Sequence, residues 1–179
     1  MSDVPKMLFP QRKPDHPSFA ILRDWWRDLE NDRGGRAALR RAASLTEVML
    51  CPGFHRLLNE LRRVGYAVSE SRYPKLAIIA GLASRIKAEI DEGLAKRMGS
   101  PKPGGEKATV SELRMRRLLA CDDLDELYTL LRRALALLDD RANLADLAAV
   151  VWHWTPMDEK SPYDPRRRMA YDYYAEAPL

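Results

Sequence analysis

Apolar residues recur along the chain at intervals of three and four positions, the spacing of one face of an α-helix. The stretches with this spacing are 17–31, 52–64, 73–91, 109–121, 124–138 and 143–154. No segment alternates polar and apolar residues over more than a few positions, as a half-buried strand would. Trp25 and Trp26 fall within the first stretch, which favours core packing over a base-stacking role. The pattern predicts an all-α protein of roughly six to eight helices.

Proline and glycine divide the predicted helices into groups. Residues 1–16 contain prolines at three positions, which predicts a loose arm without a regular element. Glycine, proline and lysine are concentrated between residues 93 and 108, which predicts a flexible linker. The chain is then expected to form two small helical bundles, over 17–92 and 109–179, joined by that linker.

Several helix starts carry capping signals. Ser44 with Glu47, and Thr109 with Glu112, have the spacing of a capping box. Asn143 precedes an apolar stripe and is expected to cap its helix.

One short segment is strongly basic. Residues 33–41 read Arg-Gly-Gly-Arg-Ala-Ala-Leu-Arg-Arg, with no acidic residue inside the segment or in the five positions after it. The two glycines are expected to end the helix before them. A helix that starts after them places Arg36 and Arg40 one turn apart on one face, and Arg41 extends that face. A fixed cationic face suits a phosphate backbone, although a solvated surface helix has the same pattern.

The distribution of charge supports a polyanionic partner for the first half. The chain has 179 residues, 46% of them apolar, and a net charge of +4, which is ordinary for a globular protein. Residues 1–110 carry 20 lysines and arginines against 13 acidic residues, whereas residues 111–179 carry 10 against 13. The N-terminal part is therefore the expected seat of a polyanion.

The cysteines and the apolar runs bear on the compartment. Cys51 and Cys121 are far apart and lie in apolar patterns, so two reduced thiols in a cytoplasmic protein are expected. No apolar run approaches the length of a membrane span, and the first residues are polar and proline-rich rather than a hydrophobic signal segment. We therefore expect a cytoplasmic protein with no membrane partner.

A search for catalytic chemistry finds no pattern that predicts an enzyme. The three histidines and two cysteines are scattered, so the closely spaced ligands of a zinc site are missing. There is no phosphate-binding loop and no Gly-x-Ser-x-Gly turn. The acid pairs at 122–123 and 139–140 lie at predicted helix ends, where capping is favoured over metal binding. We predict no enzymatic activity, no metal, no cofactor and no small-molecule substrate.

Further arginines lie in the second half of the chain. Arg114 and Arg117 are three positions apart and share a helix face. Arg132 and Arg133 lie off a leucine-rich stripe. The arginines at 166–168 fall in the first turn of a C-terminal helix, where cations oppose the helix dipole. An anionic partner or an acidic neighbour is therefore expected there.

The order and spacing of several motifs resemble those of a known family. The motifs are Trp25-Trp26, Gly35-Arg36-Ala37-Ala38-Leu39-Arg40-Arg41, Pro52-Gly53-Phe54-His55-Arg56-Leu57-Leu58, Leu113-Arg114-Met115-Arg116-Arg117-Leu118-Leu119, Leu130-Leu131-Arg132-Arg133-Ala134-Leu135, Asp146-Leu147 and Trp152-His153-Trp154. Together they resemble the CasB family, the small subunit of the type I-E CRISPR surveillance complex called Cascade. The resemblance covers residues 18 to 154 and extends to Tyr174 in some members.

The resemblance carries expectations about fold, partners and site. It implies two helical bundles, and two copies of the chain side by side among the other Cascade subunits and the guide RNA. Such subunits bind nucleic acid without reading its sequence and help to stabilise the R-loop, in which guide RNA pairs with one strand of the target DNA. They have no catalytic role. The matching motif positions place the nucleic-acid contacts on Arg36, Arg40, Arg41, Arg114, Arg117, Arg132 and Arg133.

Two other classes of protein fit parts of the pattern. A helical adaptor would bind only protein and leave its arginines solvated or paired with acidic partners. A helix-turn-helix regulator would use the basic helix after the two glycines to read DNA, but that helix has no Asn or Gln to recognise adenine.

Overall fold

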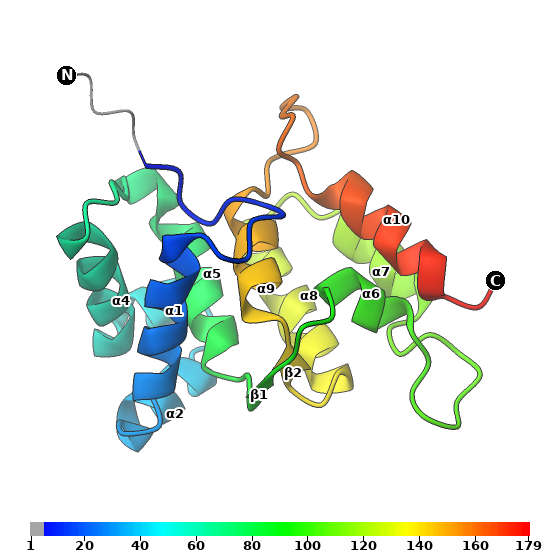
Figure 1. Cartoon of the computed structure of the whole chain (residues 1–179), viewed down its shortest axis with the longest axis horizontal. Helices are drawn as coiled ribbons and strands as arrows, with labels where there is room; N and C mark the ends of the chain where they lie inside the picture. The colour runs from blue at the N-terminus through cyan, green and yellow to red at the C-terminus, as the bar shows by residue number, and fades with distance from the viewer. Residues whose placement is uncertain (1–5) are drawn as a thin grey trace.

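The computed structural model describes residues 6–179, and within them the fold is almost entirely helical (Figure 1). The helices are α1 (Pro17–Asp28), α2 (Arg33–Arg41), α3 (Leu45–Leu50), α4 (Pro52–Arg63), α5 (Tyr73–Ala83), α6 (Leu94–Gly99), α7 (Glu112–Leu119), α8 (Leu124–Leu137), α9 (Leu144–Trp152) and α10 (Arg166–Glu176), with a 3₁₀ turn, η1 (Glu70–Arg72). Two short strands, β1 (Ala88–Glu89) and β2 (Arg141–Ala142), pair in parallel. The all-α prediction is confirmed, and residues 6–179 contain ten α-helices rather than the predicted six to eight.

Helix α5 lies at the centre of the fold. Its residues from Leu76 to Ala83 are all buried, because a helix that is apolar on every side is stable only when other elements surround it. Helices α2, α3 and α4 pack on it from the first half of the chain, and α8 and α9 pack on it from the second. In Figure 1, α5 and α9 lie between the helices at the two ends of the molecule. The buried apolar side chains form one continuous cluster.

The predicted helix over 73–91 is too long, because α5 ends at Ala83. The chain turns there and its backbone pairs with a distant segment: Lys87 N donates to Asp140 O at 2.8 Å, and Ile90 N donates to Ala142 O at 3.2 Å. Asp139 and Asp140 have positive φ angles of 58° and 55°, and this turn brings the segment after α8 alongside β1. These acids thus terminate α8, as their position at a helix end predicted.

The region predicted as a linker, 93–108, contains helix α6. Leu94, Ala95 and Met98 are buried in it, and α6 packs along α10. The Leu94 amide donates to the Asp146 carboxylate at 2.7 Å. Only residues 102–107 form a fully exposed loop. The helix was hidden in the sequence because its apolar positions are few and glycines flank it. The division into two bundles stays a prediction.

Three of the predicted helix starts were tested by the structure. The capping box at Ser44 is confirmed, since its hydroxyl accepts from Glu47 N at 3.2 Å while the Glu47 carboxylate accepts from the amide of residue 43 at 2.7 Å. Asn143 caps α9 by accepting from Asp146 N at 2.9 Å. The prediction at Thr109 was wrong: Ser111 caps α7, and the Thr109 hydroxyl donates instead to the carbonyl of residue 100.

The N-terminal arm has no helix in residues 6–16, but it is packed rather than loose. Leu8, Phe9 and the adjacent proline are buried. Phe9 N donates to Ser18 Oγ at 3.1 Å, and His153 Nε2 lies 3.0 Å from Phe9 O. Apolar side chains between the prolines supply this packing. The part of the predicted arm at residues 1–5 lies outside the described residues.

The tryptophans of α1 belong to the core, as their apolar surroundings predicted. Trp25 is buried and Trp26 is partly buried against the core. Both indole N–H groups donate to main-chain carbonyls, Trp25 to Gly53 O at 2.9 Å and Trp26 to Ile86 O at 3.2 Å. Each ring packs against the core and uses its indole N–H in a hydrogen bond, so each tryptophan joins α1 to a distant segment of the first half.

Candidate nucleic-acid interface

Helix α2 begins at Arg33, three residues before the start that the two glycines predicted. Asp32 is its N-cap and accepts from Gly35 N at 2.9 Å, so the two glycines lie inside the first turn rather than ending α1. A Cβ at Gly35 would collide with the Asp32 carboxylate, so a larger residue there would displace the capping side chain. Leu39 is buried and fixes the rotation of the helix, so Arg40 is held on the other side.

Arg36 is tied into the fold rather than free for a partner. Its Nε donates to Ser84 O at 3.0 Å and its Nη2 donates to Ile86 O at 2.7 Å. The Glu30 carboxylate, which precedes α2, lies 3.4 Å from Arg36 Nη1 and offsets part of the guanidinium charge. The side chain is 17% exposed. Arg36 therefore joins α2 to the end of α5 and presents only one edge to solvent.

The first cationic hollow lies beside α2. It has a volume of about 390 Å³ and is lined by Arg33, Arg36, Arg40, Lys87 and the carboxylate of residue 30. Within the described residues, Arg33 and Arg40 have no acidic partner. The fold thus brings the basic helix together with a lysine that lies beyond the end of α5.

Two donors from α8 and one from the segment after α5 bind the carbonyls at the end of α2. Tyr128 Oη donates to Ala42 O at 3.0 Å, and Arg132 Nη1 donates to the same carbonyl at 3.1 Å. Arg85 Nη1 donates to Arg40 O at 3.3 Å. Cationic donors at a helix C-terminus satisfy its free carbonyls and offset its negative end. This contact sets the cations of α8 beside those of α2.

The second cationic hollow follows from that contact. It is lined by Arg85, Thr129, Arg132, Arg133 and Ala136 and has a volume of about 280 Å³. Arg133 is exposed and, among residues 6–179, has no ion-pair partner. Arg85, which lines this hollow, donates to the carbonyl of Arg40, which lines the first hollow, so one hydrogen bond links the two sets of residues.

The third hollow is a groove between α7 and α8. Arg114 and Arg117 line it from α7, and Arg133 lines it from α8 and so borders two hollows. Arg117 pairs with Glu126, with Nη2 at 2.9 Å from Oε1. Arg114 is exposed and pairs with no acid in the described part of the chain. In Figure 1, α7 lies behind α10.

We call these three hollows together the arginine track: Arg133 lines both the second and the third, and the hydrogen bond from Arg85 to Arg40 O links the second to the first. Its cations are Arg33, Arg36, Arg40, Arg85, Lys87, Arg114, Arg117, Arg132 and Arg133. Six of the seven arginines proposed from the sequence lie on it. Arg41 lines none of the three hollows and is exposed at the end of α2. The sequence reasoning missed Arg85 and Lys87, because they were placed inside a longer helix.

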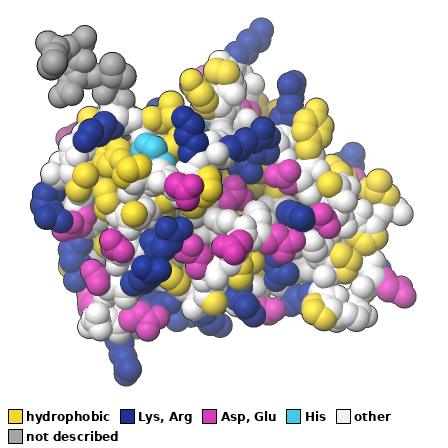
Figure 2. All heavy atoms as spheres, viewed as in Figure 1, with side chains coloured by type: hydrophobic (Ala, Val, Ile, Leu, Met, Phe, Trp, Pro, Cys, Tyr) yellow, Lys and Arg dark blue, Asp and Glu magenta, His cyan; other side chains and the backbone are white. Residues whose placement is uncertain are grey.

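A second surface, of mixed charge, covers α1, α9 and α10. Figure 2 shows that face, on which basic and acidic side chains are interspersed. Its cations are largely paired: Arg23 lies 2.9 Å from Glu89, and Arg168 lies 3.0 Å from Asp146. The acidic neighbours expected for the C-terminal arginines are thus present.

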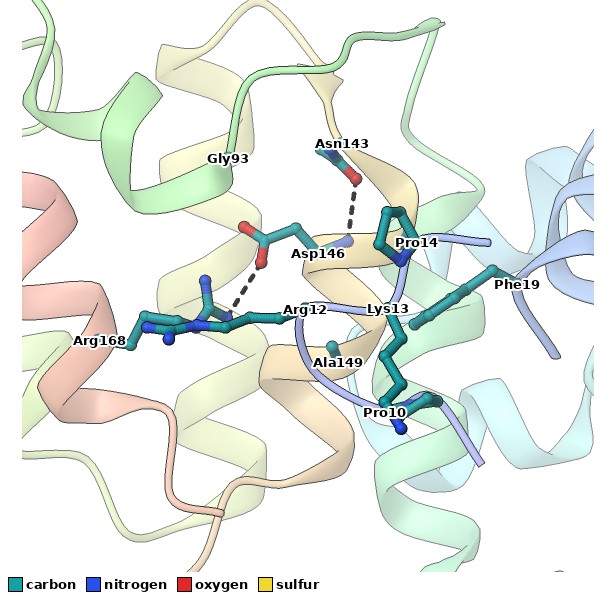
Figure 3. Close-up of a pocket in the computed structure, with 11 residues that line it drawn as sticks. Pro10, Arg12, Lys13, Pro14, Phe19, Gly93, Asn143, Asp146, Ala149 and Arg168 are labelled. Atoms are coloured by element: carbon teal, nitrogen blue, oxygen red, sulfur yellow. Dashed lines mark hydrogen bonds and ion pairs between the residues drawn. The ribbon is translucent and has the colours of Figure 1, made fainter. Parts of the chain in front are cut away.

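One hollow on this second surface was not foreseen. It has a volume of about 220 Å³, and Figure 3 shows Arg12, Lys13 and Arg168 around it with Asp146 at its inner side. Within the described residues, Arg12 and Lys13 have no ion-pair partner. Treating the arm as loose hid this hollow, since it exists only where the arm packs over α9.

Titratable groups with perturbed pKa values lie away from the arginine track. Burial, with a smaller contribution from Arg72, lowers the pKa of Lys75 to about 8, and its Nζ donates to Trp152 O at 3.3 Å. Burial raises the pKa of Cys121 to about 11. Both cysteines are free thiols. Among residues 6–179 no group of three His, Cys, Asp or Glu side chains could hold a metal ion, and no helix there is long and apolar enough to span a membrane.

The fold and the surface define a small helical protein with a cationic track that joins its two halves. Residues 35–174 match the family model described as CRISPR-associated protein Cse2. The chain therefore belongs to the Cse2 family, also called CasB, the small subunit of type I-E Cascade. This confirms the resemblance drawn from its motifs. Neither the curated proteins nor the solved structures give a significant match.

Proposed function

We propose that this Cascade subunit binds nucleic acid without reading sequence and has no catalytic role. In this proposal the arginine track holds the sugar–phosphate backbone of guide RNA or target DNA and so stabilises the R-loop in antiviral defence. The observation that supports it is that helices from both halves of the chain contribute arginines to the three linked hollows of the track. Other Cascade subunits, including a second copy of this chain, are the proposed protein partners.

The chemistry of the track fits backbone contacts better than base recognition. Guanidinium groups pair with phosphate oxygens in a planar, two-pronged geometry. The track carries no Asn or Gln, the side chains that recognise adenine. Pairing with the guide supplies the sequence specificity of such a complex, so a protein subunit need supply only charge.

The number of available cations sets the strength of binding. Arg33, Arg40, Arg114 and Arg133 have no acidic partner in the described chain. For a single strand, four neutralised phosphates give a slope of about −3 in log K against log salt. Binding by the isolated subunit is therefore weak at cellular salt, and the surrounding assembly strengthens it by holding the strand close.

The test compares two variants with equal changes of charge. Arg40, Arg114 and Arg133 are replaced together by Glu in one variant; Arg27, Arg63 and Lys160, which lie outside the track, are replaced together by Glu in the other. We expect wild type and the second variant to bind several unrelated single-stranded oligonucleotides with a steep salt dependence. We expect the first variant to lose that binding at every salt concentration.

Three results would contradict the proposal. Equal loss in both variants would show a response to net charge alone, without a defined track. No binding by wild type at low salt would favour the protein adaptor, a function that the internal bonds of Arg36 and Arg132 and the exposed Leu113 would also suit. Strong preference for one duplex sequence would instead indicate a helix-turn-helix regulator.

A further inference from the structure

The groove between α7 and α8 differs from the other two hollows of the track in having an apolar floor. Leu118 supplies it from α7, and Leu130, Ala134 and Leu137 supply it from α8, where they are spaced three and four residues apart. Val110 closes one end. Leu130 and Leu137 are only partly buried, so apolar surface remains open to solvent within a cationic surface.

The size of the groove limits what can enter it. Its volume is about 110 Å³. An apolar cavity of about 150 Å³ accepts a benzene molecule, whereas a single water needs about 30 Å³. The groove is smaller than that enclosed cavity but is open to solvent, so it can seat one flat six-membered ring with its outer edge in water, and its floor is small for a fused double ring. No hydrogen-bonding side chain lines the groove apart from the arginines, so a ring would be held by apolar contact and by guanidinium stacking.

The charges around the groove indicate what carries that ring. Arg114, Arg117 and Arg133 line the groove together with the apolar floor, and only Arg117 has an acidic partner among the described residues, Glu126. A ligand that matches both parts has one flat apolar ring with negative charge close on either side. A nucleotide within a strand has this form, because its base is flanked by two phosphates.

We propose that this groove is a base pocket, which takes one unstacked pyrimidine-sized base from a strand lying on the arginine track. Arg114 and Arg133 bind the phosphates on either side of that base. The inference rests on the proposed function and deepens it: most of the track contacts backbone only, and here the protein also grips a base without distinguishing cytosine from thymine.

Wild-type protein provides the first test, which does not depend on how a variant folds. Binding of a twelve-nucleotide oligo-dT is compared with binding of a chain of equal length and charge whose sugars lack bases. We expect the abasic chain to bind about tenfold more weakly with an unchanged salt slope. Oligo-dT carrying 4-thiothymine should crosslink on irradiation to the tryptic peptides 118–132 or 134–141, which contain the groove floor.

A filled groove provides the second test. Ala134→Leu places a larger side chain on the floor, and Ala20→Leu makes the same change at an exposed position of α1. We expect the Ala134→Leu variant to bind oligo-dT and the abasic chain equally, while Ala20→Leu keeps the tenfold difference. A circular dichroism spectrum identical to wild type shows that the variant is folded.

The outcomes separate this inference from the proposed function. If wild type binds both chains equally tightly with a steep salt slope, the backbone track stands and the base pocket is wrong. If wild type binds neither chain at low salt, both are wrong. If crosslinks fall elsewhere and Ala134→Leu changes neither affinity, no base enters the groove and the base pocket is wrong.

Discussion

Arg166 shows how a cation can be buried near a helix start. Its guanidinium donates to three main-chain carbonyls, those of Leu119, Thr155 and Cys121, at 2.6–2.9 Å. It also pairs with Asp122 and Asp164, and it stacks on the indole of residue 154 at 4.3 Å. These acceptors and carboxylates surround the guanidinium and offset its unfavourable interaction with the start of the α10 dipole. Arg166 thereby fastens the start of α10 to the α7–α8 turn.

Replacing Arg166 by alanine should be strongly destabilising. The change leaves several buried acceptors without a donor, and we expect the free energy of unfolding to fall by about 3 kcal/mol. Arg167→Ala is the matched control, because the neighbouring side chain is exposed and its loss should matter by less than about 0.5 kcal/mol. Urea unfolding measures both. Equal stabilities for the two variants would show that the network at Arg166 contributes nothing.

At this scale the sequence identified arginines but not what each one contacts. Arg36 reaches a carbonyl 48 positions away, and Arg132 reaches one 90 positions away. Both acceptors are main-chain carbonyls. Every residue has one, so no sequence motif indicates which carbonyl an arginine will bind. Helical spacing therefore predicted which arginines share a face but could not distinguish structural ones from those that remain available, such as Arg40.

Among the elements, α6 and α10 make the closest helix contact. Gly99 ends α6, and a Cβ there would collide with the main-chain carbonyl of Tyr173 in α10. The Tyr173 hydroxyl donates to Val110 O at 2.6 Å, so α10 is also fixed to the loop before α7. Neither helix can move away without breaking other contacts.

Gly99→Ala should therefore destabilise the protein by about 1–3 kcal/mol, because the added methyl group pushes two helices apart. Gly34→Ala is the opposite case: Gly34 lies in α2 with nothing within 4 Å of an added Cβ, so a gain of up to about 1 kcal/mol is expected from helix propensity. Thermal unfolding distinguishes the two. A stable Gly99→Ala protein would mean that α10 is free to shift.

The N-terminal arm should make stability depend on pH. Burial lowers the pKa of His153, and Arg72 and Lys75 lower it further, against the raising effect of its bond to Phe9 O. The unfolded pKa is about 6.5, so below that pH the unfolded chain takes up the proton first. Stability that is full above about pH 6.5 is then lost as the pH falls. His16 has its pKa lowered in the same direction.

The contribution of His153 can be isolated by substitution. His153→Gln removes one of the two titrating groups, so its free energy of unfolding should fall less steeply than that of wild type between about pH 7 and pH 5. His55→Gln serves as the control, because His55 is exposed on α4. Urea unfolding at several pH values gives the comparison. Parallel curves for wild type and His153→Gln would refute this origin of the pH dependence.

Periodicity located most helices, but it failed where long-range contacts decide a boundary. The apolar pattern of α5 continues through Ile86 and Ile90, yet the helix stops because its next residues pair with the segment after α8. Helix α6 is too short to show a periodic stripe, and its stability comes from α10. The end of α5 and the presence of α6 both depend on contacts between residues more than 45 positions apart in the sequence, which a local pattern cannot show.

The whole molecule shares one core across the predicted domain boundary. Helix α5 packs against α3 and α4 on one side and against α8 and α9 on the other. Trp152, at the end of α9, accepts at its carbonyl from Arg72 and Lys75. Removing either half would expose the apolar surface of α5 to water, at a cost of about 25 cal/mol for each Å².

We therefore expect a single unfolding transition. Tryptophan fluorescence and far-ultraviolet circular dichroism should give the same urea midpoint, because the halves lose their shared core together. A second measurement uses a protease site inserted in the exposed loop at 102–107: after cleavage the two fragments should stay together on gel filtration. Two separate transitions, or fragments that part, would establish two independent bundles.

The arginine track has an energetic consequence for the free subunit. Folding gathers cations from α2, α7, α8 and the segment after α5 onto the arginine track, where they repel one another until an anion binds. Dissolved salt screens repulsion between exposed charges over about 10 Å or less. The same ions that weaken attachment of a strand therefore relieve the strain in the unattached protein. Added salt therefore stabilises the free subunit but weakens its complex with a strand. In the complex, the phosphates of the strand neutralise the cations that dissolved counterions screen in the free protein.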